Sequence, residues 1–145
     1  MKGLSMRSMR TFCTLALLAA AAPAFAADDP LYAEMGGKEG LDRLVDVSVD
    51  IYIADPRIKM HFAESNIDRI RAQFKDQFCQ IAGGPCAYKG HDMVEAHKGL
   101  KLTNYDFAAV VEDLQLAMEK VGLTFAVQNR FLARLAPMKP QVVTR

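Results

Sequence analysis

Apolar residues recur at three- and four-residue steps through most of the chain from residue 38 to residue 135. This spacing places them on one face of an α-helix, which turns once every 3.6 residues. In the last such segment, for example, Phe125, Phe131 and Leu135 fall on the expected inner face. No convincing run shows the strict alternation of apolar and polar residues that is typical of a half-buried strand. The pattern therefore predicts an all-α domain with four substantial amphipathic helices and several short helical segments.

Stop and capping residues divide this pattern into elements. The first long helix should end at Ala54-Asp55-Pro56, because proline disfavours helix in the residue before it. Gly83-Gly84-Pro85 is a second firm stop. Asn66, Thr103 and Thr124 are expected to cap the later helices, because their side chains can accept hydrogen bonds from the first turn. The long helices are expected at 38–53, from Asn66 to Gly83, from Thr103 to Gly122 and from Thr124 to Pro137.

Residues 1–26 have the composition of a secretory signal. Three basic residues and no acidic ones precede an apolar run, and the segment ends in Pro23-Ala24-Phe25-Ala26, a small-residue cleavage site. The alternative is a membrane anchor, but the apolar run is shorter than the roughly 20 residues that a spanning helix needs. We therefore expect a signal peptide at 1–26 and one domain at 27–145. The expected location is outside the cytoplasm, in the periplasm, with no membrane contact after cleavage.

The charge of the mature chain excludes one class of partner. Residues 1–26 carry three of the 18 Lys and Arg residues and none of the 17 Asp and Glu, so residues 27–145 have a formal charge of −2. Proteins that bind nucleic acid usually present a basic stripe or patch. We expect no nucleic-acid partner for this chain.

Cys79 and Cys86 are the two cysteines that remain after cleavage. They lie seven residues apart on either side of Gly83-Gly84-Pro85, so a chain reversal there would bring them together. An oxidising compartment would favour a disulfide between them. The alternative is two independent small apolar side chains, and the sequence leaves both readings open.

His97 is the candidate metal ligand. It ends a short helical segment, four residues after Met93, and a neutral imidazole is the commonest protein ligand for iron or zinc. The alternative for His97 is a structural role, which is more common for a lone helical histidine. The alternative for the fold is a simple bundle of the four amphipathic helices. However, the loop at 83–91 is long for a bundle connection, and the His97 segment is too short to support one. These features favour a segment that presents a ligand.

The order and spacing of several short motifs extend this interpretation. The motifs are Gly36-Gly37, Ala54-Asp55-Pro56, Phe62, Gly83-Gly84-Pro85, Tyr88-Lys89-Gly90, Asp92-Met93, His97 and Leu102-Thr103 through Phe107. Together they resemble the truncated haemoglobins, most closely group I, over roughly Leu31 to Pro137. The resemblance implies a globin-like two-over-two helical sandwich around one noncovalent haem b. Covalent attachment has no support, because the chain contains no Cys-x-x-Cys-His motif.

The resemblance also assigns roles to individual residues. His97 matches the proximal histidine that binds the haem iron, and Phe62 matches an aromatic residue that packs on the porphyrin. Other positions match contacts that line the haem pocket: Phe78, Met93, Leu102 and Phe107. Simple core packing is the alternative role for each of these apolar residues.

The opposite, distal side departs from the family pattern. Group I members usually place a tyrosine and a glutamine there, as hydrogen-bond donors to bound oxygen. Counting back from Phe62 and from Gly83 puts Val49 and Phe74 at these two positions, with Ile70 at a third. All three are apolar, which predicts a distal pocket that holds oxygen weakly. The polar residues nearby that offer an alternative donor are Tyr52, His61 and Gln73.

The expected function is reversible binding of a diatomic ligand (oxygen, NO or CO) as a carrier, scavenger or sensor rather than as an enzyme. The alternative is a periplasmic haem redox enzyme or electron-transfer protein that acts on NO, nitrite or peroxide with a redox partner. A third reading, a helical binding module without cofactor, is disfavoured by His97 and the aromatic residues around it. The sequence carries no signal for an oligomeric state.

Overall fold

The computed structural model describes residues 30–145, so the predicted signal peptide lies outside the described residues. Within this range the chain forms helices and no strand, and none of the helices is long and apolar enough to cross a membrane. In chain order the elements are α1 (Leu31–Glu34), α2 (Gly37–Ala54), η1 (Lys59–Phe62), α3 (Ile67–Ile81), α4 (Met93–Ala96), α5 (Asn104–Lys120), α6 (Phe125–Leu135), η2 (Ala136–Met138) and α7 (Lys139–Val142).

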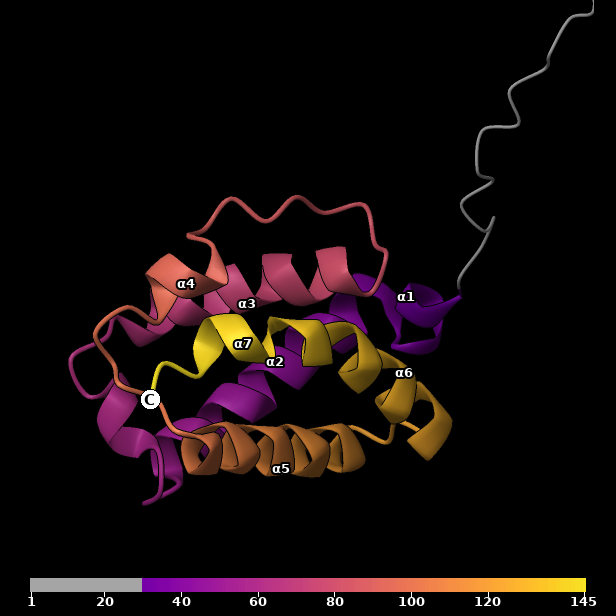
Figure 1. The fold of residues 1–145 in the computed structure, drawn as a ribbon. Helices are drawn as coiled ribbons and strands as arrows, with labels where there is room; N and C mark the ends of the chain where they lie inside the picture. Colours follow the sequence, from indigo (N-terminus) through magenta and orange to yellow (C-terminus); the bar gives the residue numbers. More distant parts are fainter. Residues whose placement is uncertain (1–29) are drawn as a thin grey trace, which may run out of the picture.

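The four long helices form two pairs (Figure 1). α2 packs against both α3 and α5, and α6 contacts α3. The pair α2 and α3 thus lies over the pair α5 and α6, which confirms the two-over-two arrangement expected for a truncated globin. Phe131, Leu41 and Leu44 are fully buried between these layers. Phe125, by contrast, is 73% exposed at the first turn of α6, so its expected inward position is wrong.

The predicted caps are confirmed. Asn66 accepts a hydrogen bond from the backbone N–H of Arg69 at 2.9 Å and so begins α3. Thr103 and Asp106 form a reciprocal capping box at the start of α5, which satisfies two backbone donors at once. Thr124 caps α6 in the same way as Asn66 caps α3. Each of these helices therefore begins at the capping residue that the sequence indicated.

The last long helix, α6, ends just before Pro137 as predicted, but it is followed by further helical turns that were not predicted. The chain continues as η2 and α7, which carry Pro137 and Pro140 in their first turns. Proline is tolerated there because its missing N–H has no acceptor in the first turn of a helix. These two prolines mark new helical starts, and the added turns close one side of the cavity described below.

Candidate functional site

A cavity of about 450 Å³ lies between the helices, and every element from η1 to α7 contributes to its walls. Apolar and aromatic side chains form most of the lining. Eight of the nine candidate site residues lie on it: Phe62, Ile70, Phe74, Phe78, Met93, His97, Leu102 and Phe107. The structure therefore brings together residues that are up to 45 positions apart in the sequence.

His97 presents its imidazole to this cavity from the C-terminal end of α4. Asp92 caps the other end of α4, accepting a hydrogen bond from the backbone N–H of Glu95 at 2.9 Å. The His97 Nδ1 lies 2.7 Å from the carbonyl oxygen of Met93. Because a carbonyl only accepts, Nδ1 must carry the hydrogen, and in the neutral ring Nε2 keeps its free lone pair. A metal-binding histidine is commonly oriented by such a second hydrogen bond.

Val49 does not line the cavity, so its assignment to the site is wrong. Its side chain is fully buried among the residues of the core. Tyr52, one helical turn further along α2, reaches the cavity wall and is only 2% exposed. The error comes from counting back from Phe62 at a fixed spacing through the irregular connection between α2 and η1.

Two glutamines also line the cavity beside Ile70 and Phe74. Gln73 and Gln77 lie on α3, and Gln77 is 8% exposed. The Gln77 amide nitrogen lies 3.3 Å from the sulfur of Met93 and donates to it. A thioether is a weak acceptor, so this donor is available for a stronger one. The expected apolar distal side is therefore wrong, because Tyr52 and Gln73, two of the alternative donors that the sequence offered, share this wall with Gln77.

Aromatic rings hold Tyr52 in place. Its ring stacks on Phe62 with centroids 6.0 Å apart and meets the edge of Phe74 at 6.5 Å. Phe74 in turn stacks on Phe78 at 5.7 Å. Burial raises the pKa of the Tyr52 hydroxyl above its ordinary value, and the negative charge of Asp113 adds to this effect. The hydroxyl therefore stays protonated at neutral pH and remains able to donate a hydrogen bond.

A further polar pair lies on the wall of the cavity. The His61 Nε2 is 3.5 Å from an oxygen of Asp106, and both residues line the cavity. Hydrogen bonds from Thr103 lower the pKa of Asp106, and His61 contributes to the same effect. His61 is thus partnered by a carboxylate of α5, which leaves Tyr52 and the two glutamines as the better-placed donors.

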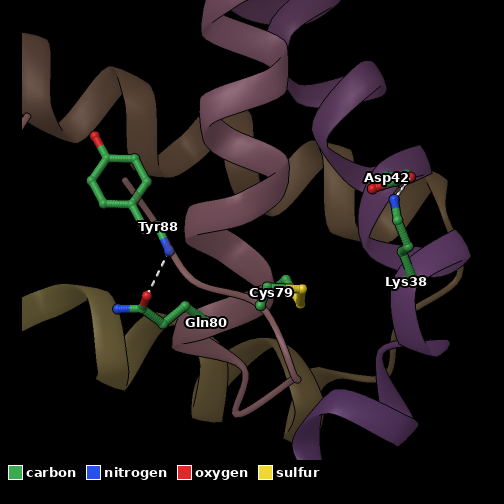
Figure 2. The surroundings of a disulfide bond; sticks show 6 residues. Lys38, Asp42, Cys79, Gln80 and Tyr88 are labelled. Atoms are coloured by element: carbon green, nitrogen blue, oxygen red, sulfur yellow. Dashed lines mark hydrogen bonds and ion pairs between the residues drawn. A yellow bond between two sulfur atoms is a disulfide. The ribbon is translucent and has the colours of Figure 1, made fainter. Parts of the chain in front are cut away.

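A disulfide ties the loop between α3 and α4 to the end of α3. Cys79 and Cys86 are bonded, which decides between the two readings that the sequence left open. Figure 2 shows Cys79 with Gln80, whose side-chain oxygen accepts a hydrogen bond from the backbone N–H of Tyr88 at 2.7 Å. A Cβ at Gly84 would lie 2.7 Å from the Cys79 sulfur, so only glycine fits there. Together these contacts place Tyr88 on the cavity wall.

A buried acid of α5, Asp113, lies outside the cavity lining and next to the C-terminal end of α2. Asp113 is 6% exposed, and its Oδ2 has no hydrogen-bond partner. Its other oxygen is 3.4 Å from Arg57, which also pairs with Asp55 and Glu112. Burial, together with the nearby charge of Asp55, raises the pKa of Asp113 to about 6. The charged form of Asp113 is therefore unfavourable in the folded protein.

Asp113→Asn is expected to stabilise the protein at pH 7. Because the folded pKa lies above the ordinary value of 3.8, the protonated acid stabilises the fold at pH values below 3.8, and this stability is lost as the pH rises through 6. Asparagine resembles the protonated acid and keeps that contribution, which is worth about 1–3 kcal/mol. Urea unfolding should show the gain at pH 7 and little of it at pH 4. Glu112→Gln, at an exposed partner of Arg57, is the control; a less stable Asp113→Asn variant at pH 7 would contradict the prediction.

Comparison with known proteins agrees with this geometry. A model of the bacterial-like globin family matches residues 30–144, nearly all of the described chain. The chain belongs to this family. As a bacterial-like globin it is a haem protein of the class that binds small gaseous ligands.

Relatives of this globin include several group 1 truncated hemoglobins. It is 35% identical to the one from Tetrahymena pyriformis over 99 residues, which cover 68% of this chain and 82% of that protein. It is 28% identical to the one from Mycolicibacterium paratuberculosis over 114 residues, covering 79% and 84% of the two chains. The crystal structure of the Tetrahymena pyriformis protein in its Fe(III) form matches this globin with a TM-score of 0.77 at 30% identity. The match covers 79% of this chain and 98% of that one.

The lining of the cavity suits a haem group. One oriented imidazole offers a ligand for iron, and aromatic rings and aliphatic side chains supply the apolar surface that a porphyrin needs. Sequence reasoning missed Gln77 and the wall that η2 and α7 contribute through Met138 and Val142. The spacing of four between Gln73 and Gln77 was a usable signal, because residues four apart lie on the same helix face.

Proposed function

We propose that this globin binds haem b in its cavity with His97 as the iron ligand and reversibly binds a diatomic ligand, oxygen, NO or CO. The hydrogen bond from His97 Nδ1 to the Met93 carbonyl is the observation that carries the proposal. It fixes the ring orientation and leaves Nε2 free for the metal. When bound, the haem supplies the iron atom at which a gaseous ligand is held.

The apolar side chains of the cavity are proposed to hold the porphyrin. Phe62, Phe78 and Phe107 supply large ring surfaces, with Ile70, Phe74, Met93 and Leu102 between them. Burying apolar surface contributes about 25 cal/mol per Å², so the extended porphyrin faces gain much of their binding energy from this contact. The same side chains exclude water from the space where the gaseous ligand binds.

Tyr52, Gln73 and Gln77 are proposed as the donors that contact the bound ligand. Solved structures of the Tetrahymena pyriformis protein include one variant with a tyrosine replaced by phenylalanine and two with a glutamine replaced by glutamate. In that protein the tyrosine precedes the first glutamine by 21 residues, and the second glutamine follows four residues later. Tyr52, Gln73 and Gln77 have this same spacing. Their positions on one cavity wall support a common role as hydrogen-bond donors.

We also propose that this globin is exported through residues 1–26 and works in the periplasm. The disulfide between Cys79 and Cys86 supports this location, because disulfides persist in oxidising compartments and are rare in the cytosol. Expression of the full chain in a bacterial host, followed by cell fractionation and N-terminal sequencing, should find a periplasmic protein beginning at Ala27. An uncleaved cytoplasmic product would contradict this location.

A hemin titration tests the proposed function. Residues 27–145, purified without haem, should develop a strong Soret band that saturates at one hemin per chain. Acid–solvent extraction should then release the pigment completely, because the proposed attachment is noncovalent, and a pyridine haemochrome spectrum should identify it as haem b. A protein that gains no Soret band would overturn the proposal.

A further inference from the structure

The segment that joins α4 to α5 directly follows His97 and adopts an unusual backbone conformation. Lys101 has a φ of 54° and Gly99 a φ of 81°, both in the left-handed region. A non-glycine residue in that region costs on the order of 1 kcal/mol and persists where the surrounding structure holds it. The next residue, Leu102, is 8% exposed and lines the cavity. Contacts from another part of the chain must therefore stabilise the strained backbone of this segment.

The last two residues of the chain, Thr144 and Arg145, supply these contacts. The backbone N–H groups of Thr144 and Arg145 both donate to the carbonyl oxygen of Leu102, at 3.0 and 3.1 Å. These two bonds occupy both lone pairs of that oxygen. Figure 1 shows the C-terminal end of the chain beside the segment that leads from α4 into α5. The two stretches are thus bonded directly through the backbone, five residues after His97.

Packing of α7 extends this contact to the helix that carries His97. α7 contacts α4. Val142 of α7 lines the cavity, and so does Met138, the residue that directly precedes α7. The ammonium group of Lys139 lies 5.5 Å from the centre of the Phe107 ring, which connects α7 to α5. Residues 139–145 therefore span α4, the strained segment and α5.

Few other contacts support α4. It has four residues, and a helix this short has no stability of its own. Its side-chain link to α3 is the hydrogen bond from Gln77 to the sulfur of Met93, which is a weak acceptor. Val94 and Leu100, on either side of His97, are 55% and 37% exposed. The position of His97 thus depends strongly on what lies against α4 and Leu102.

We propose that residues 139–145 act as a C-terminal strap that positions His97 by holding Leu102 and α4. This inference rests on the proposed role of His97 as the iron ligand. By fixing the backbone after His97, the strap keeps the imidazole in the orientation that binds iron, so the strap controls how firmly haem is retained. The strap residues contact neither the metal nor the gaseous ligand; they are positioning residues.

Thr144→Pro tests the strap, because it removes one of the two backbone donors and leaves the cavity side chains unchanged. Val143 already has φ −77° and ψ 112°, the extended conformation that a residue before proline requires. Thr144→Ala is the matched control, since it keeps the N–H. A chain ending at Val143 removes both donors without proline and serves as the second variant. Far-UV circular dichroism reports whether each variant folds.

Three readouts follow. Hemin transfer to an acceptor protein should be about fivefold faster in Thr144→Pro and faster still in the shortened chain, as expected for losing one and then two hydrogen bonds. The iron–histidine stretching frequency of the ferrous, ligand-free protein should shift in both variants. Amide hydrogen exchange at residues 98–103 should accelerate by a similar factor, with or without hemin. Thr144→Ala should match the wild type in all three.

The outcomes separate the strap from the proposed function. If both variants match Thr144→Ala in hemin transfer, stretching frequency and hydrogen exchange, the strap is wrong and haem binding through His97 stands. If the variants change hydrogen exchange but leave the iron–histidine frequency and hemin transfer unchanged, residues 139–145 support the fold without positioning His97, and the inference again fails. If the wild type binds no hemin, the proposed function fails and the positioning role fails with it.

Discussion

His97→Ala is expected to lose bound hemin more than about 100-fold faster than the wild type. Removing a residue that only orients a metal ligand commonly costs 10- to 100-fold in affinity, so removing the ligand itself should cost more. The apolar walls of the cavity remain, so some hemin should still bind, with a weaker and shifted Soret band. Hemin transfer to an acceptor protein, followed by absorbance, measures the difference.

His91→Ala is the matched control, because His91 is an exposed histidine in the neighbouring loop. Its backbone carbonyl accepts a hydrogen bond from Tyr88, which the substitution leaves in place. Free imidazole should restore the Soret band of His97→Ala by occupying the space of the missing ring, and a purely structural histidine would not be rescued this way. Normal hemin retention by His97→Ala would remove the ligand assignment.

The fold was largely predictable because its signals are local. Helical periodicity, the caps at Asn66, Thr103 and Thr124, and the stop at Gly83-Gly84-Pro85 each depend on residues within one or two turns. The short helical turns after α6 were not predicted, because proline is compatible with two outcomes. It can end a helix or occupy the first turn of a new one, and the choice depends on whether the following turns find something to pack against. Here they pack against α4.

Site residues could be predicted from the sequence where a single residue within a recognisable motif has the chemical role. His97 and Phe62 belong to this group, and both line the cavity. The distal wall was predicted poorly because its register depends on the connection between α2 and η1, and counting residues through an irregular segment is unreliable. A shift of three residues along α2 exchanged a buried core valine, Val49, for the tyrosine that reaches the cavity. Only the three-dimensional arrangement distinguishes the two.

Tyr52→Phe is expected to accelerate oxygen dissociation from the ferrous protein by roughly 10- to 100-fold. A hydrogen bond to a ligand that carries partial negative charge contributes about 1–3 kcal/mol, and phenylalanine removes the donor while keeping the ring. The stacked contact with Phe62 should survive, so the cavity should keep its shape. Carbon monoxide is nearly nonpolar, and its dissociation rate should change little. Stopped-flow displacement of each gas measures the two rates.

Tyr105→Phe is the matched control for this prediction, because Tyr105 is 65% exposed and absent from the cavity lining.

Gln77→Leu provides a second test, since the amide donor of Gln77 contacts only the weak sulfur acceptor of Met93. If Tyr52 and Gln77 donate to the same ligand, each substitution should speed oxygen release, and the double variant should differ from the sum of the two because neighbouring donors couple. An oxygen dissociation rate that Tyr52→Phe leaves unchanged would show that the buried hydroxyl points away from the ligand. The two glutamines would then be the donors left on this wall of the described chain.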